Sequence, residues 1–129
     1  MPSVATLEGT CLLVPKAESQ EFKSIFDSLG GTVECKDEKI MNRAMIPCNL
    51  MGPLYGIMRN TREWLVDQGM PAEDASYLVA RQFKSMVQDA NLDSRNPTRF
   101  DELIKEQTPG GFNEQVSFMT RSKFFITFL

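Results

Sequence analysis

The chain has 129 residues, of which 42% are hydrophobic and 24% are charged, so it is long enough to bury a core as one domain or one domain and a small additional piece. Fourteen basic against seventeen acidic residues give a net charge of −3. There is no cluster of lysine or arginine, which argues against a nucleic-acid-binding protein. No basic segment followed by an apolar core is present, and no apolar run is long enough to span a bilayer, so we expect a cytoplasmic protein with no membrane partner.

The absence of histidine restricts the chemistry more than any other feature. It removes the usual general base, the usual metal ligand and every Ser-His or Cys-His nucleophile. Acid–base chemistry would fall to carboxylates, Lys, Cys or Tyr, and we expect no metal site. The odd count and wide spacing of Cys11, Cys35 and Cys48 predict reduced core residues, not disulfides or a metal site.

Residues 1–38 predict a strand–helix–strand unit. Residues 10–15 are a short β-prone run that ends at a proline, and residues 17–31 have apolar side chains at helical spacing followed by two glycines. A second short strand follows at residues 32–35. Such a unit needs a parallel sheet, and two strands alone are too few to be stable. We therefore expect the sheet to be completed elsewhere or by pairing across a dimer.

Residues 39–129 predict a helical domain. Pro47 and Pro53 should break or kink its first apolar stretch, and Pro71 should open a second helix. That helix carries an apolar stripe, which we expect to pack in a core instead of lining a ligand pocket. The stripe consists of Ala75, Leu78, Val79, Phe83, Met86, Val87 and Ala90.

The end of this domain predicts two further helices and an apolar tail. Asn96–Pro97 should start a short helix, and another should begin at about Phe112. The last seven residues, 123–129, are aromatic and β-branched with no polar face. Exposed, such a segment would aggregate, so we expect it to pack onto a partner chain or onto the core.

The stretch "QTPGGFNEQV", residues 107–116, combines a tight glycine loop with the first turn of a predicted helix. Adjacent glycines let backbone amides approach a ligand, and a helix start adds free N–H groups and a positive dipole end. That combination suits a carboxylate or a phosphate. Taken alone, however, Pro-Gly and Gly-Gly mark turns more often than binding sites.

The chain resembles the pyrroline-5-carboxylate reductase family over essentially all 129 residues. The resemblance is carried by a colinear set of short motifs, in which no single motif is decisive. They are "MPSVA", "GTCLLVP", "FDSLGG", "DEKIMN", "LMGPLYG", "WLVDQGMPAEDASYLVARQ" and "TPGG". The resemblance implies that residues 1–38 are the last strands of a nucleotide-binding domain. It also implies that residues 39–129 are a helical dimerisation and substrate-binding domain, and the chain an interleaved homodimer.

The resemblance also implies a substrate site for a small cyclic imino acid. Its carboxylate would be held by the loop Thr108, Pro109, Gly110 and Gly111, with Asn113 and Asn49 as further binding residues. The nucleotide-binding half is missing, because no G-x-G-x-x-G occurs. We therefore expect no cofactor on this chain alone, and NAD(P)H only if a separate nucleotide-binding chain pairs with it.

The family's substrate wall, Thr-Gly-x-Ser-Gly-Ser-Gly-Pro-Ala-Tyr, is altered over residues 46–55. Its glycine, proline and tyrosine near the end are retained as Gly52, Pro53 and Tyr55. Its first hydroxyl is replaced by Ile46, and its two serines by an asparagine and a methionine. Losing hydroxyls removes hydrogen-bond donors from the predicted pocket. This pattern indicates an outlying branch of the family in which the reductase chemistry is altered or lost.

Three functions remain open from the sequence. The first is a dimerisation and small-carboxylate-binding module without the cofactor half. The second is a cofactor-independent cyclase, isomerase or lyase that uses the pocket at the dimer interface, with Tyr55, Asn49, Cys48 and Glu114 as candidate catalytic residues. The third is a purely structural dimerisation partner. For Tyr55 the alternative is a core aromatic, for Cys48 a small buried residue, and for Glu114 a stabiliser of a helix start.

Overall fold

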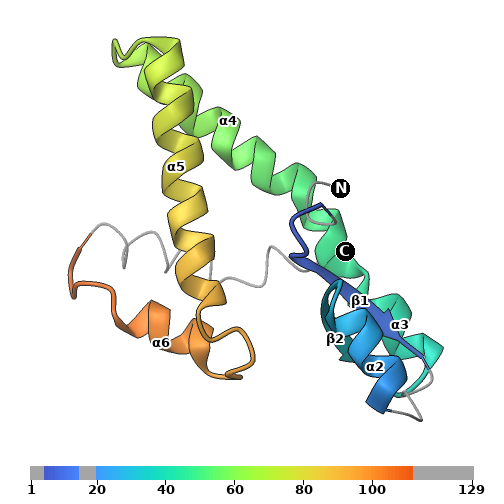
Figure 1. Cartoon of the computed structure of the whole chain (residues 1–129). Helices are drawn as coiled ribbons and strands as arrows, with labels where there is room; N and C mark the ends of the chain where they lie inside the picture. The colour runs from blue at the N-terminus through green and yellow to red at the C-terminus, as the bar shows by residue number, and fades with distance from the viewer. Residues whose placement is uncertain (1–4, 15–19, 112–129) are drawn as a thin grey trace. The chain divides into compact units, whose positions relative to one another are not determined.

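The structure is a computed structural model that describes residues 5–14 and 20–111 (Figure 1). The described part of the chain is mainly α-helical, with one two-stranded parallel sheet, which confirms the mainly α class that was predicted. The chain divides into two compact units, Met1–Pro53 and Leu54–Leu129. Segment 39–53, which we had assigned to the helical domain, therefore lies in the first unit.

The first unit contains the predicted strand–helix–strand arrangement. Strand β1 (Gly9–Leu13) is followed by helix α2 (Gln20–Asp27) and strand β2 (Gly30–Glu34). The strands are parallel, in a register that pairs the first residue of β1 with the first residue of β2. Two parallel strands need a crossover between them, and α2 provides it. The prediction of a parallel strand–helix–strand unit is confirmed.

The small core of this unit lies around the sheet. Leu13, Thr32 and Cys35 are buried, and the Thr32 hydroxyl donates a hydrogen bond to Asp27 at the end of α2. The other oxygen of the Asp27 carboxylate accepts an ion-pair hydrogen bond of 2.8 Å from Lys23 Nζ. Because a buried hydroxyl without a partner is costly, this bond both satisfies Thr32 and attaches α2 to the sheet.

The segment with the two prolines folds into short helices. Helix α3 (Glu38–Ala44) is capped by Asp37, whose side chain accepts a 2.8 Å hydrogen bond from the Ile40 N–H. A 3-10 helix, η1 (Ile46–Leu50), follows with a proline in its first turn, and α4 (Met51–Asp67) begins directly after it. The predicted break at Pro47 is confirmed. Pro53 lies in the first turn of α4, where no intrahelical N–H bond is lost, so it does not kink the helix.

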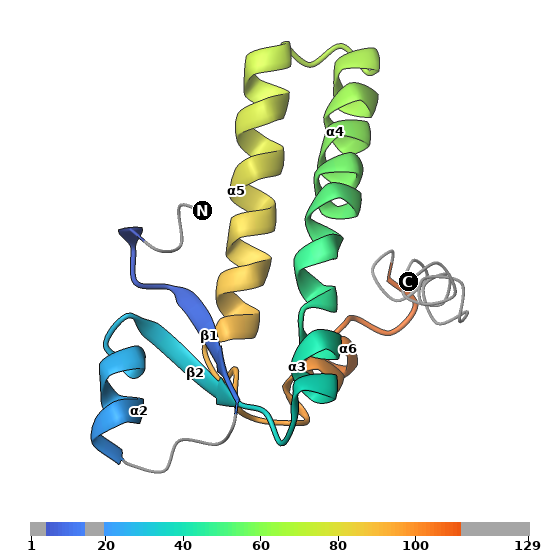
Figure 2. The same cartoon turned by 90° about the vertical axis from the view of Figure 1, so that its right-hand side faces the viewer.

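The second unit is built on a helical hairpin. From Leu54 onward α4 runs to a short turn at Gly69, which adopts φ +96, and α5 (Ala72–Asn91) returns antiparallel to it (Figures 1 and 2). Pro71 is the residue at the start of α5, as predicted. Figure 1 shows that the two helices diverge with distance from the turn.

The short helix α6 (Arg99–Lys105) completes the described part of the second unit. It is attached to the end of α5 by Arg99, whose Nη2 donates hydrogen bonds to Asp89 Oδ1 at 2.8 Å and to the Asp89 carbonyl at 3.2 Å. The predicted helix after Asn96–Pro97 is confirmed. The helix predicted from Phe112 and the apolar tail at 123–129 lie outside the described residues.

The apolar stripe of α5 is only partly buried, which differs from the expected core. Ala75 and Val79, near the turn, are 0% and 5% exposed. Farther along, Met86 and Val87 are 52% and 60% exposed. Among residues 5–14 and 20–111, the part of the stripe near the turn is the most deeply buried, and α4 and α5 diverge beyond it (Figure 1). The pattern correctly marked an apolar face but did not determine what covers it.

Candidate functional site

The glycine loop predicted to hold a carboxylate is a tight β-turn. The Gly111 N–H donates a 2.9 Å hydrogen bond to the Thr108 carbonyl, and Gly110 has φ +73. Pro at the second position, a positive-φ glycine at the third and this hydrogen bond are the features of a type II turn. One amide of the predicted anion site is therefore used inside the turn. A Cβ atom at Gly111 would lie 2.9 Å from the Thr108 carbonyl oxygen, so the turn also requires glycine there.

The candidate catalytic residues of the substrate wall are exposed. Cys48 and Asn49 lie in η1, and both are accessible to solvent. Tyr55 lies in the second turn of α4 and is 59% exposed. The structural alternatives for two of them, a core aromatic at Tyr55 and a buried small residue at Cys48, are wrong for the isolated chain. Of the three cysteines only Cys35 is buried, because β2 and its neighbours enclose it.

The predicted site residues are distributed over both units. Cys48 and Asn49 belong to Met1–Pro53, whereas Tyr55 and the turn Thr108–Gly111 belong to Leu54–Leu129. Asn113 and Glu114 lie outside the described residues. Each unit thus holds part of the predicted site, and the assembled pocket remains a prediction.

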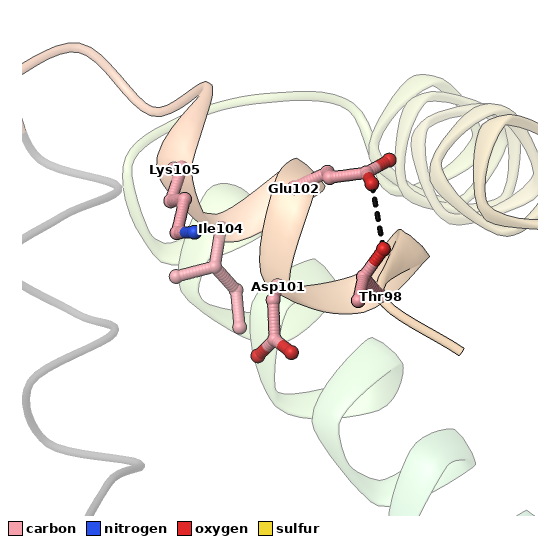
Figure 3. A pocket seen from close by; sticks show the side chains of 5 residues that line it. All are labelled: Thr98, Asp101, Glu102, Ile104 and Lys105. Carbon is pink, nitrogen blue, oxygen red and sulfur yellow. Dashed lines mark hydrogen bonds between the residues drawn. The ribbon is translucent and has the colours of Figure 1, made fainter. Parts of the chain in front are cut away.

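A hollow beside α6 was not predicted from the sequence (Figure 3). It has a volume of about 550 Å³ and is lined by Thr98, Asp101, Glu102, Ile104 and Lys105. All five residues come from α6 or its cap, so the hollow is a concave strip along one short helix. Its lining is mixed, with two carboxylates, an ammonium group, a hydroxyl and one apolar side chain. These five side chains do not bring a nucleophile, a general base and an oxyanion donor together, as a catalytic site requires.

The best-defined polar cluster of this strip is the cap of α6. The Thr98 hydroxyl donates a 2.7 Å hydrogen bond to Glu102 Oε1, and the Asn96 amide lies 3.3 Å from each oxygen of the same carboxylate. The Thr98 hydrogen bond, followed by that of Asn96, lowers the pKa of Glu102 below its ordinary value, because both favour the charged form. The Asn96 Oδ1 in turn accepts a 2.9 Å hydrogen bond from the Thr98 N–H. The cluster holds the Asn96–Pro97 turn in place.

This cluster predicts an acid-sensitive contribution to stability. Because the folded pKa of Glu102 is lowered, its carboxylate stabilises the fold above the ordinary glutamate pKa of about 4.3, and that contribution is lost as the pH falls through the lower folded value. Thermal unfolding followed by circular dichroism from pH 6 to pH 3 should show the wild-type chain above Glu102→Gln at pH 6 and the two converging at low pH. The control is Glu106→Gln, which removes the same charge one residue beyond α6. A Glu102→Gln difference that stays constant down to pH 3 would contradict the assignment.

Large apolar side chains are exposed on both helices of the α4–α5 hairpin. Ile57 and Trp64 of α4 are 46% and 60% exposed, and Leu78 of α5 is 44% exposed. With about 100° between successive residues, Ile57 and Trp64 fall on one side of α4. We call the surface formed by Ile57 and Trp64 the apolar face.

Residues 5–14 and 20–111 contain no candidate metal site and no candidate membrane span. No group of three or more Cys, Asp or Glu side chains in this part of the chain is placed to hold a metal ion. Within the same ranges, no helix combines the length and the apolar character needed to cross a bilayer.

Comparisons of the chain with protein-family models, with curated proteins and with solved structures returned no match. The resemblance to pyrroline-5-carboxylate reductases therefore stays a prediction from the short motifs of the sequence.

Proposed function

We propose that this chain is a homodimeric assembly and small-carboxylate-binding module of the pyrroline-5-carboxylate reductase type, without the NAD(P)-binding half and with the reductase chemistry altered or lost. The observation that carries the proposal is the imbalance between buried and exposed apolar side chains. Among the described residues, Leu13, Cys35, Ala75 and Val79 are the buried hydrophobic residues. Large side chains such as Trp64, by contrast, are exposed along α4 and α5. A monomer rarely leaves so much apolar surface in water, so a partner surface is needed.

The apolar face has the composition of a subunit contact. Tryptophan and other large apolar side chains are enriched at the centres of protein interfaces, where burying an aromatic side chain removes about 150–250 Å² from water. A second copy of the same chain supplies a self-complementary face through a two-fold axis.

The carboxylate-binding part of the proposal rests on the turn Thr108–Gly111 and on the family resemblance. A purely structural dimer is the second candidate, and one observation favours it: the Gly111 N–H already has an acceptor in the Thr108 carbonyl. Binding of a carboxylate by this loop would have to use other amides of the segment. The cofactor-independent enzyme is less favoured, because the candidates Cys48, Asn49 and Tyr55 are exposed side chains.

The proposal is tested by the mass of the purified chain in solution and by calorimetric titration with proline and NADPH. We expect a dimer by light scattering, binding of proline and no binding of NADPH. Trp64→Glu should convert the dimer to a monomer with unchanged helix content, because the side chain is exposed within one chain. Tyr77→Glu is the matched control, since Tyr77 is 69% exposed, lies on α5 and is not part of the apolar face.

The outcomes separate the candidates. A wild-type monomer at all concentrations would refute assembly. The proposed module is supported if the wild-type dimer binds proline, the Gly111→Val variant does not bind it, and the Gly31→Val variant still does. Gly31 is the control because a Cβ there meets no atom within 4 Å. A dimer that binds no carboxylate leaves the purely structural function.

A further inference from the structure

A groove runs between α4 and α5 on the side of the hairpin that carries two arginines. Its volume is about 180 Å³. Its walls are Met58, Arg59 and Arg62 from α4 and Ser76, Val79 and Ala80 from α5. All six residues belong to the unit Leu54–Leu129, so the groove is formed within one compact part of the chain. The α5 wall is made of short side chains. The guanidinium groups of Arg59 and Arg62 on α4 are therefore the largest polar groups of the groove.

The charges around this groove are unbalanced. Arg59 and Arg62 are three residues apart on α4 and therefore neighbours on the helix surface. Both pair with the single carboxylate of Glu63, Arg59 Nε at 3.7 Å from Oε1 and Arg62 Nη2 at 3.4 Å from the same oxygen. Two guanidinium groups sharing one carboxylate leave one positive charge uncompensated, in a chain whose net charge is −3.

One donor on the groove wall has no acceptor. Arg62 Nε is among the buried side-chain nitrogens, with less than 1 Å² of accessible area, and no hydrogen bond to the described residues satisfies it. Buried N–H donors are nearly always paired, and an unpaired one indicates a missing acceptor. An arginine presents its donors as a planar fork, which matches the oxygens of phosphate or carboxylate groups.

We propose that this groove is a binding site for a small oxyanion of the phosphate class, held by Arg59 and Arg62. The ion accepts hydrogen bonds from the guanidinium groups of Arg59 and Arg62, which line the groove, and displaces Glu63 from them. The space of about 180 Å³ equals that of roughly six waters at about 30 Å³ each, so a tetrahedral oxyanion fits with part of its hydration shell. A dianion is favoured over a carboxylate because it has to compete with the resident Glu63 carboxylate.

The groove and the apolar face lie on different sides of the hairpin. Arg62 and Trp64 are two residues apart in α4, hence about 200° apart around its axis. Ligand binding in the groove and self-association through the apolar face can therefore be measured separately. Failure of either proposal leaves the other standing.

The test is a titration of the full chain with inorganic phosphate at constant ionic strength, followed by the NMR signals of the arginine Nε–H groups. We expect saturable binding with the largest shift at Arg62. Arg62→Gln should weaken binding about tenfold or more, since hydrogen bonds to charged groups contribute about 1.5–3 kcal/mol. Arg81→Gln is the control: it removes the same charge from α5 at a residue that does not line the groove.

Glu63→Gln gives a second readout that loss of folding cannot imitate. Removing the competing carboxylate should strengthen phosphate binding about two- to fivefold, the range expected for an exposed ion pair. Equal weakening by Arg62→Gln and Arg81→Gln would show only ionic attraction to the surface and would overturn the proposal. So would the absence of saturable phosphate binding, or a Glu63→Gln affinity no higher than that of the wild type.

Discussion

Gly30→Ala is expected to destabilise the sheet of the first unit by about 2–4 kcal/mol. Gly30 begins β2 with φ +146, in the region that side chains rarely adopt. A Cβ atom there would lie 2.0 Å from the carbonyl oxygen of Gly9, its partner in the parallel register. The obstacle is backbone, so no side-chain rotation relieves it. The start of β2 must move away from β1, which removes the first pairing of the ladder.

Gly31→Ala is the matched control for this prediction. Its added Cβ meets no atom within 4 Å, and its φ is compatible with an L side chain. Amide hydrogen exchange of Cys35, whose N–H donates a 2.9 Å bond to the Leu13 carbonyl at the end of the sheet, reports the opening of the strands. Fast exchange in Gly30→Ala with near wild-type exchange in Gly31→Ala is the expected result. Similar exchange in both variants would show that the close approach at Gly9 does not constrain the sheet.

Val79→Asp is expected to destabilise the hairpin of the second unit by about 3 kcal/mol. Val79 is 5% exposed and Ala75, one turn before it, is 0% exposed, so these residues are the buried contact between α5 and its surroundings near the turn. A carboxylate placed there loses its hydration. Either it opens the hairpin or it takes up a proton, and both lower the free energy of unfolding.

Val87→Asp is the control, because it makes the same change on the same helix at a side chain that is 60% exposed. The lower helix propensity of aspartate affects both variants alike. Thermal unfolding followed by far-ultraviolet circular dichroism should show a large loss for Val79→Asp and a change within about 0.5 kcal/mol for Val87→Asp. A large loss for Val87→Asp would mean that the exposed part of the stripe is buried in solution, as a closely packed dimer would require.

Short-range signals determined much of what was predicted correctly. Proline positions set the break at Pro47 and the start of α5 at Pro71, because proline lacks an N–H group and fixes its own backbone angle. The strand–helix–strand unit was predicted because the helical spacing of its apolar residues and the two glycines after them are local features. Its parallel arrangement follows from the length of the crossover. Local signals also marked "TPGG" as a tight turn, and the structure places Gly110 at its positive-φ position.

The candidate site was predicted less well, because it depends on long-range placement. The sequence suggested free amides in the glycine loop, whereas the fold uses the Gly111 N–H to close the turn. It suggested burial for Cys48 and Tyr55, whereas both are exposed in the described chain. The arginine groove was missed because its two walls come from different helices.

The sequence by itself determined the helical character of the chain, the positions of its breaks and the apolar stripe of α5, because each depends on residues within a few turns of one another. The tertiary structure decided which part of that stripe is covered. Ala75 and Val79 are enclosed near the turn, while Met86 and Val87 are exposed where α4 diverges. Periodicity specifies a side of a helix, whereas burial depends on the angle at which another helix crosses it. That angle is set by packing over the whole hairpin.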